Sequence, residues 1–99
     1  MDERRDNRKE QTRLGFMFKT ISVSKIALDY WLSVPAFHSE MLGKMNRHEP
    51  INNNTVLKVM EEIYDRDFRP VQNTPEGLGL NFYRARKAIN QLRRAVSGE

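Results

Sequence analysis

The stretch Asn-Phe-Tyr-Arg-Ala-Arg-Lys-Ala-Ile-Asn-Gln-Leu-Arg-Arg-Ala-Val, residues 81–96, has the clearest helical pattern in the chain. Asn81 is a favourable N-cap, and Ser97-Gly98 is a favourable helix end. Apolar side chains recur at spacings of three and four residues, at Phe82, Ala85, Ile89, Leu92 and Val96. We therefore predict a C-terminal helix that packs this stripe on the core of the protein. The stripe also fits a heptad seam, but it is too short to favour a coiled coil.

The opposite side of this predicted helix is basic. At about 100° per residue it carries Tyr83, Arg86, Lys87, Asn90, Arg93 and Arg94. No acidic residue occurs between Glu76 and Glu99. Such a face suits nucleic acid, because Arg and Asn form paired hydrogen bonds with base edges and other cations contact phosphates. The alternative is a solvated basic face on an ordinary surface helix.

The order of residues from Gly79 to Leu92 resembles the second half of a helix-turn-helix motif. In this resemblance Gly79 is the turn glycine and Asn81 caps the recognition helix. The buried side is Ala85, Ala88, Ile89 and Leu92, and the side that would enter the major groove is Tyr83, Arg84, Arg86, Lys87 and Asn90. The first half departs from the motif, because Pro75 stands where the family has a small residue. The resemblance implies a DNA-binding protein that works as a dimer.

Two further helices are expected before residue 46. The first is capped by Ser22 or Ser24 and runs through Leu32; its expected inner face is Val23, Ile26, Ala27, Tyr30 and Val34, widened by Leu28, Trp31 and Leu32. We expect Trp31 to be largely buried, because this helix is apolar nearly all round. The second helix should run from Pro35 to Met45 with Ser33 as its cap; its buried stripe would be Phe37, Met41 and Met45.

Residues 46–54 are rich in turn formers and predict a loop, which a helix from Thr55 to about Asp67 follows. Its inner side would be Val56, Val59, Met60, Ile63 and Tyr64, and its solvent side Glu61, Glu62 and Asp65. The stretch from Arg69 to Asn81 is mostly turn, with the start of a short helix at Thr74-Pro75-Glu76. The expected fold is all-α, a small bundle of about four helices with a helix-turn-helix-like C-terminal half, and no sheet or at most a vestigial one.

Composition narrows the function classes. The chain has 99 residues, which is the size of one domain, and no cysteine, which rules out disulfides and thiolate chemistry. Its net charge is +4, with three basic and five acidic groups over residues 49–70 but five and two over residues 71–99. The positive charge is therefore concentrated at the C-terminal end, as expected for a protein that binds a polyanion. With no apolar run of a spanning helix or a signal peptide, we expect a cytoplasmic protein without membrane contact.

Catalysis has few candidates. His38 and His48 lack a paired ligand spacing, and the adjacent Glu61 and Glu62 diverge on a helix, so they cannot act as an opposed acid and base. No phosphate-binding glycine loop, nucleophile elbow or metal motif is present. We expect no enzyme activity, no cofactor and no metal.

Residues 1–13 contain no apolar residue after Met1, so we interpret them as a flexible charged arm beside a single helical domain at residues 14–99. Cations of this arm are possible accessory phosphate contacts, namely Arg4, Arg5, Arg8 and Lys9, but four interleaved acidic residues weaken the positive field and favour a solubilising tail. The leading hypothesis is a small DNA-binding regulator or architectural factor. The alternative is an adaptor or inhibitor that binds another protein through Phe37, Met41 and Met45 or through the acidic helix face. RNA is disfavoured, since no aromatic stacking platform is evident.

Overall fold

The computed structural model describes residues 13–98, which form helices and turns without any strand. Residues 13–17 are helical and lead into the 3-10 turn η1 (Phe18–Thr20). The main helices are α2 (Lys25–Leu32), α3 (Pro35–Asn46), α4 (Asn53–Ile63) and α5 (Phe82–Val96). A π-helical turn η2 (Tyr64–Phe68) and a 3-10 turn η3 (Arg69–Val71) extend α4, and a 3-10 turn η4 (Pro75–Gly77) precedes α5. The all-α class predicted from the sequence is confirmed.

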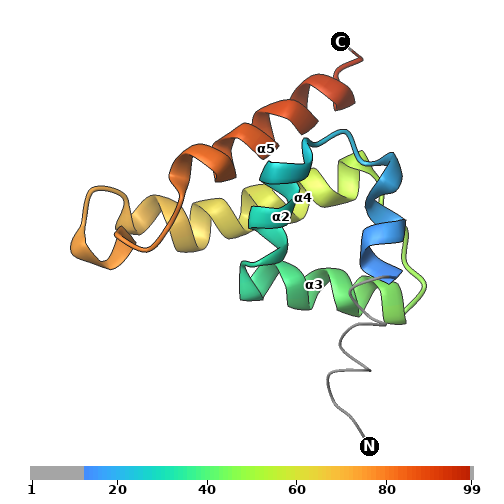
Figure 1. The fold of residues 1–99 in the computed structure, drawn as a ribbon, viewed down its shortest axis with the longest axis horizontal. Helices are drawn as coiled ribbons and strands as arrows, with labels where there is room; N and C mark the ends of the chain where they lie inside the picture. The colour runs from blue at the N-terminus through green and yellow to red at the C-terminus, as the bar shows by residue number, and fades with distance from the viewer. Residues whose placement is uncertain (1–12, 99) are drawn as a thin grey trace, which may run out of the picture.

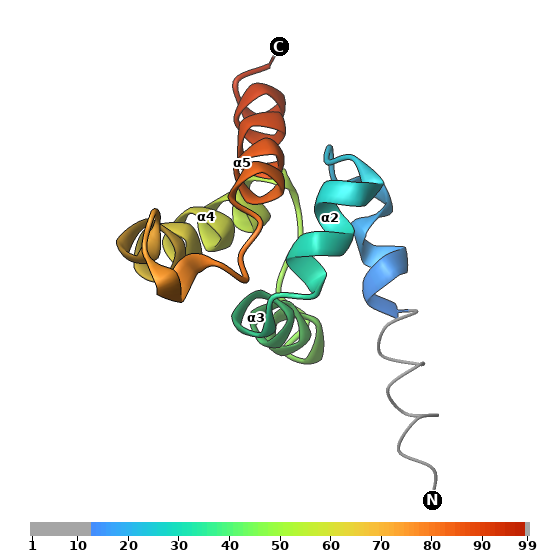
Figure 2. The same ribbon diagram turned by 60° about the vertical axis from the view of Figure 1, so that its left-hand side comes forward.

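Helix α5 packs on both α2 and α4, and α3 packs on the same two helices. Figure 1 shows α5 crossing over α2 and α4, with α3 on the far side of them. In the turned view of Figure 2 the C-terminal turns of α5 extend beyond the other helices. Helix α5 therefore rests on the bundle along one side and leaves its other side open to solvent.

The core is built around Trp31, whose side chain is fully buried, as predicted. Its ring centroid lies 5.3 Å from that of Phe37 and 5.4 Å from that of Phe68, in tilted arrangements. Phe68 in turn meets Phe82 edge-on at 5.8 Å. Aromatic pairs at such separations add to the free energy gained from burial, so this cluster joins α2, α3, η2 and α5.

The segment that precedes α2 contributes to the core, which the sequence pattern did not indicate. Leu14, Phe18 and Ile21 are buried, and the ring of Phe18 lies 6.2 Å from that of Phe37. Two hydrogen bonds fix the segment to α4: the Ser22 N–H donates to the Asn53 side-chain oxygen at 3.0 Å, and the Asn53 amide donates to the Ser22 hydroxyl at 3.2 Å. The fold therefore begins before the first helix expected from periodicity.

Helices α2 and α3 begin and end close to the predicted positions. Ser24 is the N-cap residue of α2, although its side chain makes no capping hydrogen bond. Ser33 was wrong as the cap of α3, because Val34 occupies that position while the Ser33 hydroxyl donates to the Tyr30 carbonyl. Phe37, Met41 and Met45 are buried in the core as predicted, so this stripe is not available to a protein partner.

Helix α4 begins two residues earlier than predicted. Asn52 and Thr55 form a capping box in which the Asn52 side chain accepts from the Thr55 N–H at 3.0 Å and the Thr55 hydroxyl accepts from the Asn52 N–H at 2.9 Å. The predicted inner side chains are all buried, namely Val56, Val59, Met60, Ile63 and Tyr64. After Ile63 the α-helix gives way to the π-helical turn, so the helical path continues through Phe68.

Two predicted core positions are wrong. Ile26 is 61% exposed, because α2 packs through its Ala27 and Trp31 side and no described element covers the Ile26 side. Val96 is 42% exposed, because the end of α5 extends past the helices that support it (Figure 2). An apolar pattern shows which side chains favour burial, whereas the arrangement of neighbouring helices decides which of them are covered.

None of the helices formed by residues 13–98 combines the length and apolar character that crossing a lipid bilayer requires.

Candidate nucleic-acid interface

Hydrogen bonds at its N-terminus and at Gln91 fix helix α5 in place. The Asn81 side chain accepts from the Arg84 N–H at 3.0 Å, which is the predicted N-cap, and the Asn81 N–H donates to the Tyr30 hydroxyl at 3.0 Å. Nearer the C-terminal end, the Gln91 side-chain oxygen accepts from the Ser24 N–H at 2.8 Å. Four side chains are buried beneath the helix: Ala85, Ala88, Ile89 and Leu92. Helix α5 therefore has a fixed rotation about its own axis.

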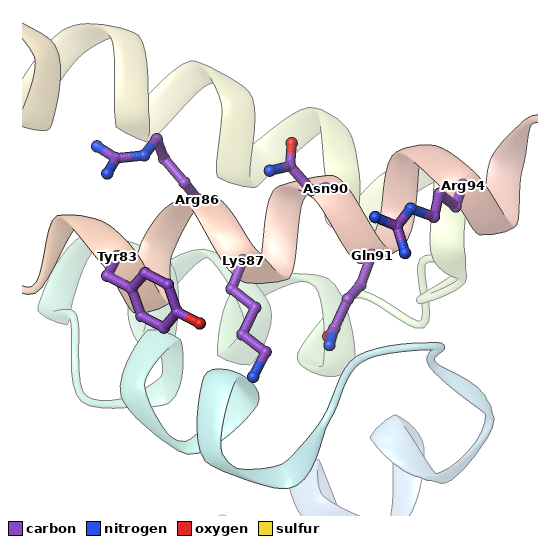
Figure 3. A pocket seen from close by; sticks show the side chains of 6 residues that line it. All are labelled: Tyr83, Arg86, Lys87, Asn90, Gln91 and Arg94. Carbon is purple, nitrogen blue, oxygen red and sulfur yellow. The ribbon is translucent and has the colours of Figure 1, made fainter.

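The exposed side of α5 carries a shallow surface depression of about 330 Å³. Six side chains of this one helix line it: Tyr83, Arg86, Lys87, Asn90, Gln91 and Arg94. Figure 3 shows Arg86 and Asn90 on the side toward α4, Tyr83, Lys87 and Gln91 on the side toward α2, and Arg94 nearer the C-terminal end of the helix. Five of the six were predicted as site residues. We refer to these six residues as the α5 face.

Gln91 was missed by the sequence analysis, because at helical spacing it lies between the polar and apolar sides. Its position one turn after Lys87 and two turns after Tyr83 is the signal that could have found it. Its side chain both lines the α5 face and accepts a hydrogen bond from the N-terminus of α2. Gln91 therefore has a structural role beside any contact with a ligand.

The cations of α5 differ in their electrostatic surroundings. Within residues 13–98, no carboxylate lies within ion-pair distance of Arg84, Arg86, Lys87 or Arg94. By contrast, Arg93 forms an ion pair with Glu61 of α4 at 2.7 Å, so Glu61 is not the solvated acidic residue that we predicted. The uncompensated charge of α5 is therefore concentrated away from Arg93.

Most cations on other elements are compensated by carboxylates. Arg66 donates two hydrogen bonds to Asp67, and this interaction lowers the pKa of the Asp67 carboxyl. The hydrogen bond from Arg47 likewise lowers the pKa of Glu49. Lys25, Lys44 and Arg69 also form ion pairs. Helix α5 is thus the described element with the largest group of cations that lack a carboxylate partner.

Two cationic side chains of the α5 face, Arg86 and Lys87, each contact a tyrosine. Arg86 donates from Nη1 to the Tyr64 hydroxyl at 3.2 Å, and the Lys87 ammonium lies 5.9 Å from the ring centroid of Tyr83. Tyr83 is 68% exposed, which is unusual for so large an aromatic ring and leaves it free to contact a ligand. Asn90 places an exposed amide between these cations.

The connection before α5 has a different geometry from a regular helix. Between η3 and α5 the only helical turn that the described chain forms is η4, and Gly77, the last residue of this turn, is buried. A Cβ atom on Gly77 would lie 2.3 Å from the Val71 carbonyl oxygen, so the chain passes too closely for a side chain there. Gly79 has open space around it and no positive φ. The helix-turn-helix resemblance stays a prediction.

The remaining residues considered in the sequence analysis are the cations of the N-terminal arm and the two histidines. The accessory phosphate contacts Arg4, Arg5, Arg8 and Lys9 lie outside residues 13–98, whereas Arg13, the last residue of the predicted arm, is helical. His38 Nδ1 lies 3.0 Å from the Leu32 carbonyl oxygen, and His48 is exposed in the turn after α3. Within residues 13–98, no three His, Asp or Glu side chains form a group that could hold a metal ion.

The chain matches no protein-family model, no curated protein and no solved structure. A function for it therefore rests on its own residues and their geometry.

Proposed function

We propose that this protein binds duplex DNA by placing the α5 face in the major groove. The observation that supports the proposal is the group of four cations on α5 that have no carboxylate partner within residues 13–98, namely Arg84, Arg86, Lys87 and Arg94. Phosphates attract such a group strongly, because ions condensed on the duplex are released when cations replace them. The protein would act as a small regulator or architectural factor.

The dimensions of α5 suit the groove. Its 15 residues span about 22 Å, and a helix with its side chains is about 10–12 Å across, which matches a major groove about 12 Å wide. Tyr83, Lys87, Asn90 and Arg94 fall within an arc of about 60° and would face the floor of the groove. The C-terminal turns of α5 extend beyond the other helices (Figure 2), which favours the approach of a duplex to that end.

The chemistry divides the face into two kinds of contact. Lys87 and Arg94 can donate to the O6 and N7 acceptors of guanine, and Asn90 can form a pair of hydrogen bonds with adenine. Arg84 and Arg86 lie at the flanks of the arc, where the phosphate backbones run. The flanking cations would supply affinity and the central side chains would supply sequence preference.

Binding to a protein partner is the second candidate function, and the structure leaves fewer surfaces for such a partner than the sequence suggested. The stripe of α3 is buried, so only the acidic side of η2 and α4 is left for an adaptor, chiefly Glu62 and Asp65. Asp65 already forms an ion pair with Arg69 at 2.9 Å. This surface carries less uncompensated charge than α5, which is why we favour DNA.

The test is fluorescence anisotropy with labelled duplexes of about 20 base pairs, which are two helical turns. The double variant Lys87→Ala with Arg94→Ala should weaken binding by about 1–3 kcal/mol for each lost base contact and relax the sequence preference. It avoids Arg86, whose guanidinium also contacts Tyr64. The matched control is Lys58→Ala with Arg66→Ala, which removes two cations from α4 and η2 and should change binding little.

For the parent protein, about two phosphate contacts, from Arg84 and Arg86, predict a slope of log affinity against log salt near −2, so that a fourfold rise in salt weakens binding on the order of 10-fold. Circular dichroism and urea unfolding should show that both double variants keep their fold. Equal losses of affinity in the two double variants would reject the α5 face as the binding surface. Tight binding to single-stranded RNA but not to duplex DNA would replace the proposal with an RNA-binding one.

A further inference from the structure

A second cationic surface lies beside the α5 face, in a cleft of about 290 Å³ between η2, η3 and α5. Six polar or charged side chains line it: Tyr64, Arg69, Gln72, Arg86, Asn90 and Arg93. Three of the six are arginines, and they come from two separate parts of the chain, residues 64–72 and residues 86–93. The fold therefore brings together a group of guanidiniums that no stretch of sequence displays by itself.

Tyr64 holds two of these arginines in place. Its ring is buried and stacks on Phe68, with centroids 5.4 Å apart and planes at 14°. The Arg69 guanidinium lies 5.4 Å from the Tyr64 ring centroid, and Arg86 donates to the Tyr64 hydroxyl at 3.2 Å. Among residues 13–98 the Tyr64 hydroxyl donates to no acceptor, so its hydrogen is available to a ligand oxygen in the cleft.

Two of the three arginines, Arg69 and Arg93, are also held by carboxylates. Asp65 accepts from Arg69 at 3.0 Å, and Glu61 accepts from both Nε and Nη2 of Arg93 at 2.9 and 2.7 Å. A guanidinium has five N–H donors, so each of these arginines keeps donors that the carboxylate does not use. With Arg86 free of a carboxylate within residues 13–98, three arginines outweigh two carboxylates by one positive charge.

We infer that this cleft binds one phosphate group of the DNA backbone and thereby fixes the register of α5 in the groove; this inference rests on the proposed function. Arg86 and Asn90 line both the cleft and the α5 face, so the two surfaces are continuous. A helix that fills the major groove has a backbone strand along each flank, and the strand on the α4 side passes the cleft. Arginine suits this role, since its planar donors match phosphate oxygens in pairs.

The cleft is tested by Arg69→Ala, with Arg66→Ala as its matched control. Both arginines are exposed, both form an ion pair with an aspartate on η2, and only Arg69 lines the cleft. Arg69→Ala should weaken binding about five- to tenfold at moderate salt and lower the salt slope by about one, equally for every duplex sequence. Arg66→Ala should leave the slope unchanged. Tyr64→Phe keeps the stacked ring, removes only the hydroxyl and should weaken binding by a smaller factor.

The side-chain NMR signals of arginine Nε provide a direct readout, and inorganic phosphate is the probe that needs no DNA. Addition of phosphate should shift the Arg69 and Arg86 signals with saturation, and should leave the Arg66 signal in place. If Arg69→Ala and Arg66→Ala bind duplex equally while the Lys87 and Arg94 variant binds poorly, the cleft is wrong and the α5 proposal stands. If the parent binds no duplex, the α5 proposal fails; saturable shifts with phosphate would then support a phosphate cleft, and their absence would overturn it.

Discussion

The indole N–H of Trp31 donates a hydrogen bond to the main-chain carbonyl oxygen of Ala85 across 3.2 Å, which joins the C-terminal end of α2 to the first turns of α5. Both residues are fully buried, so the bond lies where water cannot replace it. The position of the α5 face relative to the rest of the bundle therefore depends on this contact inside the core.

Trp31→Phe should destabilise the fold by about 2–4 kcal/mol, because it removes both buried volume and the hydrogen bond. Urea unfolding followed by circular dichroism measures the loss. Phe16→Ala is the control, since Phe16 is 69% exposed and its truncation should cost little. Equal stability of Trp31→Phe and the parent would contradict the burial and the hydrogen bond described for this residue.

Gly77→Ala should destabilise the protein and Gly79→Ala should not, although the two glycines are two residues apart. A Cβ on Gly77 meets the Val71 carbonyl oxygen at 2.3 Å and the Phe82 ring at 3.2 Å, whereas a Cβ on Gly79 meets nothing within 4 Å. We expect a cost of about 1–3 kcal/mol at Gly77 and a neutral or slightly stabilising effect at Gly79. Thermal unfolding of the two variants measures this difference. A lower melting temperature for Gly79→Ala than for Gly77→Ala would refute the turn geometry.

Glu61→Gln should strengthen binding to duplex DNA. Glu61 holds Arg93 in an ion pair at 2.7 Å, so removal of its charge frees Arg93 and lowers the repulsion of phosphates. The stability cost should stay below about 1 kcal/mol, because both side chains are partly exposed. Glu40→Gln on α3 removes the same charge from an exposed site and should have a smaller effect on affinity, which anisotropy at low salt will measure.

The stability that Arg66 provides should depend on pH. Its hydrogen bonds lower the pKa of Asp67, so the pair stabilises the fold above the unfolded-state pKa of Asp, about 3.9, and loses this effect as the pH falls through the lower folded-state pKa. Parent and Arg66→Ala should therefore differ in urea midpoint at pH 7 and converge in acid. A difference that persists in strong acid would disprove the assignment.

We expect the protein to bind DNA as a dimer. A domain this small gains stability from added burial, and a helix-turn-helix unit reads two half-sites about 34–36 Å apart through a two-fold partner. Sedimentation velocity, with and without duplex, measures the mass. A single monomeric species at high micromolar concentration in both conditions would exclude the dimer.

The sequence predicted α5 closely because three local signals agree there: an apolar stripe at helical spacing, an N-cap residue and a helix end at Ser97-Gly98. Asn81 caps the helix and the stripe is buried at Ala85, Ile89 and Leu92, since local signals act over a few residues. Ile26 and Val96 were misplaced for the opposite reason. Their exposure depends on which helices lie alongside, and this is a property of the tertiary arrangement that a one-dimensional pattern does not contain.

The site residues likewise divide into those that helical spacing predicted and those that only the tertiary structure brings together. The predicted α5 residues share one helix, so helical spacing alone placed Tyr83, Lys87, Asn90 and Arg94 together. The cleft beside them joins Tyr64 to Arg86, which are 22 residues apart in the chain, and no spacing rule links them. Sequence analysis also could not foresee that Arg93 is compensated by Glu61, because 32 residues separate that pair.

Trp31, Tyr30 and Ser24 of α2 and its N-cap form three hydrogen bonds with α5 and with its N-cap residue Asn81. These bonds prevent α5 from rotating about its own axis. The conformational entropy of orienting α5 is therefore lost when the chain folds, before any ligand arrives. Association with DNA should resemble rigid-body docking, with a small change in heat capacity, because little apolar surface remains to be buried on binding. A helix that folded only on its target would give a large negative change instead.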